Sequence, residues 1–434
     1  MFRRDFFKFS MFSTIALNFN NLQANTSFNK NNNYLKTTIA ICGAGFAGLS
    51  CVKRLKELKP NLDITLIEKN SSFSSCPFSN QWLTNISNIS YEDLNFSYYN
   101  SINRYNYNFI NEKVVNIDKD KKLLYMSNNK ILKYEYLILS TGIDYDYEKI
   151  FKDNEKIKQC KFKAPAGLKP GSEHLALKKM IQNFKGGNFI ISIPSGAYKC
   201  PPAPYERACL IAQYFKSNKI KAKVIVLDPR EKPASKANEF LNAFNTYYKD
   251  YINYKPYTNF KDIDFEKKEI TFESFDMLEL DYKTKKLSFE EANIIPPNKA
   301  NKLIQLAKLE TNNGFAKLQE PTFRSISSPY IYVVGDAQGQ YPFPKSAQMA
   351  NSCAYVLAQE LISRLDKKTF DYKSNLPGNV CYSMITKTKA VSIMHEYSYK
   401  NDKLKVKAEV SNISKEVAQT AKAWYFGLTE DILG

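Results

Sequence analysis

Short apolar runs alternate with amphipathic stretches along much of the chain. The runs at residues 38–42, 63–67 and 188–193 are almost continuously apolar, which is typical of strands buried on both faces of a sheet. The stretch from residue 46 to Leu58 instead has the three-to-four-residue spacing of an amphipathic helix. Strands that alternate with helices in this way predict an α/β fold with parallel sheets.

The first strand leads directly into a glycine-rich turn. Gly43, Ala44, Gly45 and Gly48 follow the strand and open the helix, and the second strand ends in Glu68. Such glycines allow a tight turn and a close approach of backbone to a pyrophosphate, which then faces the positive end of the helix. An acid at this distance accepts hydrogen bonds from a ribose, so the unit has a dinucleotide-binding pattern.

Two later strands indicate which dinucleotide binds. The strand at residues 136–140 ends in Thr141 and Gly142, and the strand at residues 331–334 ends in Gly335 and Asp336. In flavoproteins with two dinucleotide-binding units, a late Gly-Asp pair places a carboxylate on the ribityl chain of the flavin. Together the segments predict FAD as the cofactor.

A second unit of the same kind begins with the strand at residues 188–193. Its turn, residues 194–202, contains one glycine, then Cys200, Pro201 and Pro202. Prolines lack N–H donors, so the backbone amides that would hold a pyrophosphate are missing. We predict that no nicotinamide cofactor binds here and that a thiol takes its place.

Composition narrows the chemistry further. The 434 residues are enough for two or three domains. The 2 His and 8 scattered Cys form no zinc or c-type haem motif, so we expect no metal site, and any haem must belong to another polypeptide. The net charge of +19 comes from scattered lysines, which favours a basic surface over a nucleic-acid function.

The N-terminus is typical of an exported protein. Arg3 and Arg4 precede a moderately apolar run at residues 9–19 and a small-residue cleavage site near Ala24, the pattern of a twin-arginine signal. The run is shorter than the roughly 20 residues of a membrane span, and no other span is predicted. We expect a signal at residues 1–24, a linker at 25–36, and a soluble periplasmic protein in an oxidising compartment.

Several stretches of the chain resemble the flavoprotein subunit of flavocytochrome c sulfide dehydrogenase, a relative of sulfide:quinone oxidoreductases. They are residues 75–80, 199–208, 344–346, 380–383 and 423–425. The resemblance implies two Rossmann-like dinucleotide-binding domains of the disulfide-reductase kind and a C-terminal interface domain. The expected parts are an FAD domain at 37–148 and 298–371, a second Rossmann-like domain at 149–297, and the interface domain at 372–434.

The resemblance also assigns roles to three cysteines. It implies that Cys76 bonds covalently to the 8α-methyl group of FAD, and that Cys200 and Cys381 form a redox-active disulfide. The two are 181 positions apart, and the sequence does not say which lies nearer the flavin. A buried apolar role for Cys76 and a merely structural disulfide remain the alternatives.

Two further residues acquire roles from the same family, and a third is a candidate by its position. Glu206, six residues past Cys200, is the candidate proton acceptor for hydrogen sulfide, the alternative being an acid that is solvated or paired beside Arg207. Lys345 opens a helix whose positive end would face the flavin. Trp424 matches an aromatic residue near the sulfide site, and core packing is its alternative.

The implied function is oxidation of hydrogen sulfide to sulfane sulfur or polysulfide, with electrons passing to a c-type cytochrome subunit in a heterodimer. A sulfide:quinone oxidoreductase is one alternative, and a catalytically silent sulfur carrier or assembly flavoprotein is another. A charged stretch from Tyr399 to Lys415 departs from the family pattern, and it would alter the surface that meets a cytochrome.

Overall fold

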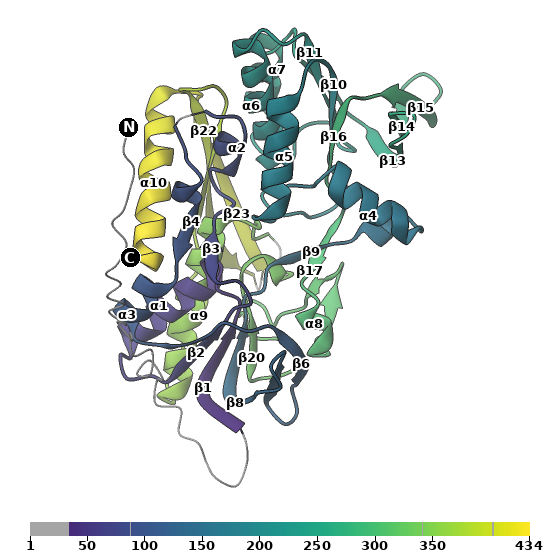
Figure 1. Cartoon of the computed structure of the whole chain (residues 1–434). Coiled ribbons are helices and arrows are strands. Elements are labelled where there is room, and N and C mark those ends of the chain that lie inside the picture. Colours follow the sequence, from purple (N-terminus) through teal and green to yellow (C-terminus); the bar gives the residue numbers. More distant parts are fainter. Residues whose placement is uncertain (1–33, 87, 341, 402) are drawn as a thin grey trace, which may run out of the picture.

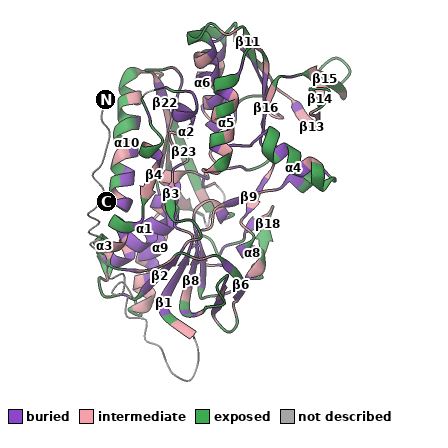
Figure 2. Cartoon of the chain, in the orientation of Figure 1, coloured by how far each residue is buried: buried purple, intermediate pink, exposed green. Residues whose placement is uncertain are grey.

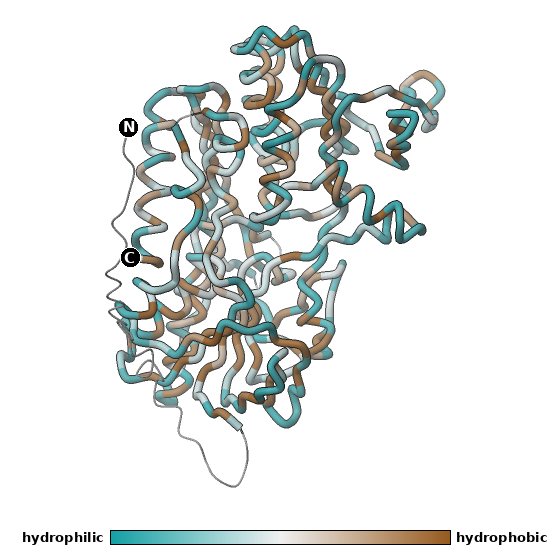
Figure 3. The backbone as a smooth tube through the Cα atoms, viewed as in Figure 1, coloured by the Kyte–Doolittle hydropathy of each residue, from teal (hydrophilic) through white to brown (hydrophobic). Residues whose placement is uncertain are grey.

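The computed structural model of the protein describes residues 34–86, 88–340, 342–401 and 403–434 (Figure 1). The expected twin-arginine signal and nearly all of the expected linker lie outside the described residues. Figure 2 shows buried residues concentrated in the strands and on the inner faces of the helices. Figure 3 shows the apolar residues in the same places, as the alternating pattern of the sequence predicts.

The first sheet has seven strands in the order β5-β2-β1-β8-β7-β6, with β20 beside β8. The strands β5, β2, β1, β8 and β20 are parallel, whereas β6 and β7 form an antiparallel extension. Helices α1 (Phe46–Leu58) and α9 (Ala347–Leu365) pack against each other beside this sheet. The strands are β1 (Tyr34–Cys42), β2 (Ile64–Ile67), β5 (Asn108–Ile110), β6 (Val114–Asp118), β7 (Leu123–Met126), β8 (Ile131–Leu139) and β20 (Ile331–Val333).

The second sheet has four parallel strands in the order β12-β11-β10-β16. It repeats the strand, turn and helix of the first unit, with β10 leading into helix α6. The strands are β10 (Gly187–Ser192), β11 (Ala222–Leu227), β12 (Ile252–Lys255) and β16 (Glu291–Ile294), and the helices are α5 (Ser172–Asn183), α6 (Ala203–Ser217) and α7 (Ala237–Thr246). An antiparallel sheet of β13 (Thr258–Asp264), β14 (Glu269–Asp276) and β15 (Asp281–Ser288) projects from this unit (Figure 1).

The C-terminal region adds an antiparallel sheet and a long helix. Strands β21 (Asn379–Met384), β22 (Ala390–Lys400) and β23 (Lys403–Val410) pair in that order, and helix α10 (Lys415–Leu433) follows. The charged stretch predicted to reshape the surface contains the largely exposed strand β23. Two Rossmann-like units with a C-terminal sheet and helix confirm the predicted fold class.

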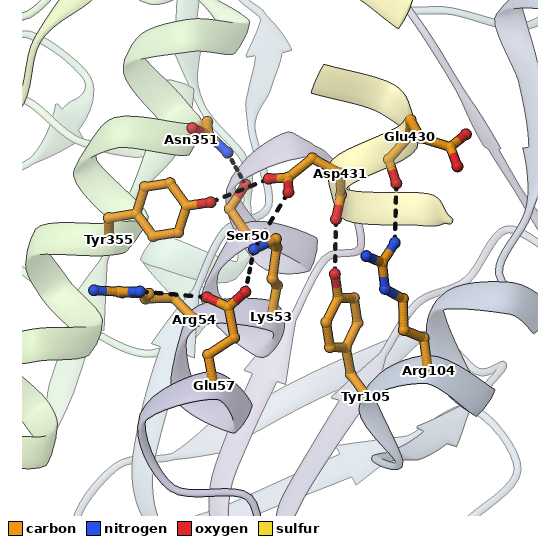
Figure 4. Close-up of polar contacts among 10 residues, drawn as sticks. All are labelled: Ser50, Lys53, Arg54, Glu57, Arg104, Tyr105, Asn351, Tyr355, Glu430 and Asp431. Atoms are coloured by element: carbon orange, nitrogen blue, oxygen red, sulfur yellow. Dashed lines mark hydrogen bonds and ion pairs between the residues drawn. The ribbon is translucent and has the colours of Figure 1, made fainter. Parts of the chain in front are cut away.

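The last turn of α10 is fixed to the first unit (Figure 4). The Asp431 carboxylate lies 3.3 Å from the Lys53 Nζ and accepts a hydrogen bond from the Tyr355 hydroxyl at 3.1 Å. The Tyr105 hydroxyl donates to the Asp431 carbonyl oxygen at 2.7 Å. Leu433 is buried in the core of the first unit. Across the described ranges, no helix combines the length and apolar character that crossing a membrane requires.

The remaining short elements connect these three parts. They are β3 (Ser72–Ser74), β4 (Asn95–Ser97), β9 (Ile143–Tyr145), β17 (Asn298–Ala300), β18 (Thr311–Asn312), β19 (Phe315–Ala316), α2 (Ser79–Leu83), α3 (Tyr99–Tyr105), α4 (Asn154–Lys163), α8 (Leu303–Leu306), and the 3-10 turns η1 (Glu92–Leu94), η2 (Tyr147–Lys149) and η3 (Gly335–Ala337).

Candidate functional site

A cavity of about 810 Å³ is lined by residues from all three parts of the fold. One end is formed by the glycine-rich turn after β1, and the other by the turns that carry the candidate cysteines. A cavity of this size falls in the range of cofactor sites. Its lining includes all but one of the candidate residues: Gly43, Ala44, Gly45, Glu68, Cys76, Thr141, Gly142, Cys200, Glu206, Gly335, Asp336, Lys345, Cys381 and Trp424.

The remaining candidate, Gly48, lies behind the glycine-rich turn. A Cβ at this position would sit 1.9 Å from the carbonyl oxygen of Gly43, so no larger residue fits unless the turn moves. Gly43 itself has a φ of +104° and packs against the backbone of Ser140. Gly48 therefore shapes the turn from behind, as the third glycine of a dinucleotide fingerprint does.

Several features of the first unit leave room and polar groups for a dinucleotide. A Cβ at Gly45 or Gly142 would meet nothing within 4 Å, and the buried Thr141 hydroxyl has no partner among the described residues. Glu68 accepts a hydrogen bond from the Ala44 amide at 2.9 Å and also lines the cavity. These residues fit FAD, which they would hold along the cavity.

Cys76 lies at the cavity, half-buried, just before helix α2. Its thiol donates to the carbonyl oxygen of Leu168 at 3.4 Å. Burial raises the pKa of Cys76, and the charges of Lys199 and Arg207 oppose that rise. The thiol is free and faces the space where FAD would lie, so the covalent bond stays a prediction.

The fold brings Cys200 and Cys381 together although they are 181 positions apart. Cys200 lies in the turn between β10 and α6, and Cys381 lies on β21. Their side chains both line the cavity and lie close enough for each to shift the pKa of the other. Both are free thiols in this structure. The proximity is compatible with a disulfide, which stays a prediction.

The turn that carries Cys200 is held in an uncommon conformation. Cys200 has a φ of +53°, in the left-handed region that non-glycine residues rarely adopt. Its amide donates to the carbonyl oxygen of Lys345 at 2.8 Å, which ties the turn to the segment before α9. Strained backbone of this kind often marks functional positions.

Glu206 lies on the first turn of α6, facing the same cavity. Its carboxylate accepts hydrogen bonds from the Asn80 side-chain amide at 2.8 Å and from the Met384 backbone amide at 2.7 Å. Burial raises the pKa of Glu206. Glu206 forms no ion pair with Arg207, whose guanidinium instead donates to the Asn80 side-chain oxygen at 3.0 Å. The role of Glu206 as a proton acceptor stays a prediction.

Lys345 lies just before α9, and Trp424 on α10 contacts the first turn of α9. The Lys345 ammonium donates to the carbonyl oxygens of Asp336 and Gln338 at 2.9 and 2.7 Å, and burial lowers its pKa to about 8. Trp424 donates to the Gln348 side-chain oxygen at 2.7 Å, with its ring beside Tyr382. The positive end of α9 thus faces the cavity, where it would favour negative charge.

The corresponding nucleotide site of the second unit is filled by protein. Asp228 follows β11 at the position of Glu68 in the first unit, and it is fully buried. It accepts hydrogen bonds from the hydroxyls of Tyr205 at 2.5 Å and Tyr254 at 3.0 Å, and it pairs with Arg230 at 3.1 Å. This carboxylate is not open to a ribose, and the expectation that no nicotinamide cofactor binds here stays a prediction.

Three site residues had no predicted role. Asn80 links Glu206 to Arg207, the Lys199 ammonium lies 3.6 Å from the Asp336 carboxylate, and Lys236 approaches the cysteine pair from α7. The chain has 62 lysines and arginines, so nothing in the local sequence marks a buried one. Asn80 and Lys199 lie in family-like stretches, which was the one available signal.

The two histidines lie away from the reacting groups. His174 is buried with its Nε2 3.2 Å from the carbonyl oxygen of Gly167, and burial lowers its pKa to about 3. The His395 Nδ1 pairs with the Asn379 side chain at 2.9 Å. Within the described part of the chain, no cluster of three His, Cys, Asp or Glu residues could hold a metal ion.

Three family models match the chain. The model for the central part of the sulfide dehydrogenase [flavocytochrome c] flavoprotein chain matches residues 174–285, and the flavin-binding model of flavocytochrome c sulphide dehydrogenase matches residues 376–433. The pyridine nucleotide-disulphide oxidoreductase model matches residues 37–156. The matches together include the glycine-rich turn, Cys76, Cys200 and Cys381.

Individual relatives agree with these models. The sulfide dehydrogenase [flavocytochrome c] flavoprotein chain of Chlorobaculum thiosulfatiphilum is 43% identical over 42 residues, which are 10% of this chain and 88% of that sequence. The mitochondrial sulfide:quinone oxidoreductase of Mus musculus is 23% identical over 232 residues, or 52% of this chain, and the match spans 50% of the mouse protein's length.

A solved structure shares the fold over nearly the whole chain. The sulfide:quinone oxidoreductase from Aquifex aeolicus superposes with a TM-score of 0.72 at 18% identity, and the match covers 92% of this chain and 91% of the other. At that identity the likeness concerns the arrangement of the chain.

Proposed function

Because this chain belongs to the family of flavoproteins that includes flavocytochrome c sulfide dehydrogenase and sulfide:quinone oxidoreductase, we propose that it oxidises hydrogen sulfide to sulfane sulfur or polysulfide. The observation that carries the proposal is the contact between Cys200 and Cys381 in the cavity that the dinucleotide turn also lines.

Each of the candidate residues has its own role in the proposed oxidation of sulfide. The thiol pair forms a disulfide, and Glu206 accepts a proton from hydrogen sulfide. The resulting hydrosulfide attacks one sulfur of the disulfide, which forms a persulfide and releases the other sulfur as a thiolate. The residues at the glycine-rich turn, with Asp336 and Lys345, would hold FAD, and Cys76 would bond to it covalently. A second hydrosulfide takes the outer sulfur of the persulfide as a polysulfide, which leaves both cysteines as thiols. Bound FAD would supply the two-electron acceptor for their return to the disulfide.

For the electron acceptor we propose a c-type cytochrome subunit in the periplasm, bound as a heterodimer partner. Two of the three matching family models are those of flavocytochrome c flavoproteins. The contacts of Asp431 and Leu433 attach the last turn of α10 to the first unit, so insertion of this turn into a bilayer would have to break those contacts. The twin-arginine pattern of residues 1–24 supports export.

A quinone acceptor is the second candidate, favoured by the similarity to mitochondrial and bacterial sulfide:quinone oxidoreductases. One anaerobic experiment separates the candidates. Sulfide should rapidly bleach the flavin absorbance, and the reduced protein should then reduce cytochrome c but not decylubiquinone. The opposite acceptor preference would select the quinone reductase. A flavin that sulfide does not bleach would leave only a silent sulfur carrier or assembly protein.

A further inference from the structure

A buried lysine beside the cysteine pair has no part in the steps given above. Lys236 immediately precedes helix α7 and is 3% exposed. Its backbone has a φ of +53°, in the left-handed region. The side chain reaches β21 of the C-terminal region, where its ammonium donates to the Ser383 hydroxyl at 2.9 Å. A cation from the second Rossmann-like unit thus lies at the strand that carries Cys381.

The alternation of side chains along β21 places the Lys236 ammonium near the Cys381 sulfur as well. Cys381 and Ser383 are two positions apart on this strand, so their side chains project from the same face. The Lys236 ammonium interacts with the Cys381 sulfur in addition to the Ser383 hydroxyl. The hydrogen bond from Cys200, followed by the positive charge of Lys236, lowers the pKa of Cys381 to about 6 against the effect of burial.

The positive charge of the buried Lys236 ammonium needs a nearby anion to balance it. In the described part of the chain, no carboxylate forms an ion pair with Lys236, and a buried ammonium is unfavourable without a nearby negative charge. The charged or titratable groups that face it are Cys381 on β21, Glu206 on α6 and His395 on β22. The Glu206 carboxylate is already held by Asn80 and Met384. The Cys381 thiolate is the anion that the lysine can meet directly.

The two cysteines are therefore unequal. The hydrogen bond that Cys200 donates to Cys381, together with burial, raises the pKa of Cys200 well above its ordinary value. Negative charge on the pair accordingly collects on the Cys381 sulfur, next to the ammonium. Attack by a nucleophile on a disulfide is favoured where the leaving sulfur is best stabilised as a thiolate.

We propose that Lys236 is a positioning residue that fixes the polarity of the cysteine pair, with Cys381 as the leaving thiolate and Cys200 as the sulfur that hydrosulfide attacks. The sulfur–sulfur bond between the cysteines breaks, a new one forms between Cys200 and the incoming sulfur, and the electron pair goes to Cys381. The assignment rests on the proposed sulfide oxidation for its substrate. The inequality of the two thiols is a property of the reduced protein alone.

The test is the rate at which iodoacetamide alkylates each cysteine in the reduced holoenzyme between pH 5 and 9, mapped by mass spectrometry. Cys381 should react first, with half-maximal reactivity near the pH given by its lowered pKa. Lys236→Met should move the profile of Cys381 up by at least about one pH unit, a roughly tenfold slower reaction on the acidic side. Lys236→Arg keeps the charge and should restore most of the reactivity.

Lys178→Met provides a matched control. This lysine is also partly buried on uncharged partners, the carbonyl oxygen of Trp82 and the side chain of Asn85, and its loss should leave the profile of Cys381 unchanged. An unchanged profile in Lys236→Met would overturn the proposal. If that variant fails to fold, alkylation of Cys200 before Cys381 in the unmodified protein would do the same. Because no sulfide is used, these outcomes are separate from a failure of sulfide to bleach the flavin.

Discussion

The two Rossmann-like units start from the same strand, turn and helix but use the turn in opposite ways. After β1, Gly45 leaves open space at the cavity, and the Thr141 hydroxyl on the neighbouring turn has no partner among the described residues. After β10, Cys200 occupies the turn, followed by Pro201 and Pro202 before α6. One turn keeps room for a phosphate-bearing ligand, and the other presents a thiol to the same cavity.

The acids that follow the second strand of each unit, Glu68 after β2 and Asp228 after β11, also differ in how open they are to a ligand. Glu68 lines the cavity and its carboxylate accepts hydrogen bonds from the Ala44 and Asn70 amides, whereas Asp228 is enclosed by two tyrosine hydroxyls and Arg230. In the second unit the acid at this position is thus part of the core. Its internal partners satisfy the buried carboxylate and so help this Rossmann-like unit keep its shape.

The largest expected effect comes from removing either thiol. Cys200→Ser or Cys381→Ser should slow sulfide-driven bleaching of the flavin by on the order of 10³-fold or more, since the two sulfurs act as a unit. Both variants should remain folded and yellow, because the flavin lies on residues of the first unit. Stopped-flow absorbance measures the rate. Bleaching at the rate of the unmodified protein would show that the thiol pair takes no part in the reaction with sulfide.

Glu206→Gln tests whether Glu206, on helix α6, is the base that accepts the proton from hydrogen sulfide. We expect a loss of about 10²- to 10³-fold in the rate of bleaching at neutral pH. Burial raises the pKa of Glu206, so the parent rate should rise as the pH passes upward through that pKa and the acid ionises. The variant should lack this rise.

Glu173→Gln is the matched control for this experiment. Glu173 is also a largely enclosed acid with a raised pKa caused by burial, and it accepts hydrogen bonds from the Tyr145 hydroxyl and the Gly167 amide. It does not line the cavity. Its variant should keep the pH-dependent rise, and a loss of the rise in both variants would point to a general effect of buried charge.

Cys76→Ser tests the covalent bond between the first unit and FAD. If Cys76 bonds to FAD, acid precipitation should leave the flavin in the pellet of the parent and release it to the supernatant from the variant. The variant should still bind FAD, because the glycine-rich turn and Thr141 remain. Release of flavin from the parent protein would show that the bond is absent.

The parts of the site that could be predicted are those encoded locally. A strand, a glycine-rich turn and a helix are neighbours in sequence, so Gly43 and Glu68 could be placed at one nucleotide site from spacing alone. Thr141 and Asp336 follow strands of the same sheet, and the ends of parallel strands meet at one edge. The fold class followed from the same alternation.

The parts that could not be predicted depend on contacts between distant segments. Nothing local pairs Cys200 with Cys381, and only the family resemblance did so. Lys236 had no signal at all, because its burial arises when the residue before α7 meets β21, far along the chain. Asn80 connects Glu206 with Arg207 for a similar reason. Such side chains are recognisable only once the three parts of the fold are in place.

The smallest expected effect tests whether the acid of the second unit has become structural. Tyr205→Phe removes the hydroxyl that donates to Asp228 at 2.5 Å, and it should lower the free energy of unfolding by about 2 kcal/mol, as for a hydrogen bond to a buried charge. Tyr134→Phe, on β8 of the first unit, is the control. Its buried hydroxyl has no partner among the described residues, so removal should cost almost nothing. Urea denaturation at fixed flavin content measures both. Equal stability of the two variants would mean that Asp228 does not depend on this hydroxyl, and the contrast between the units would then rest on their turns alone.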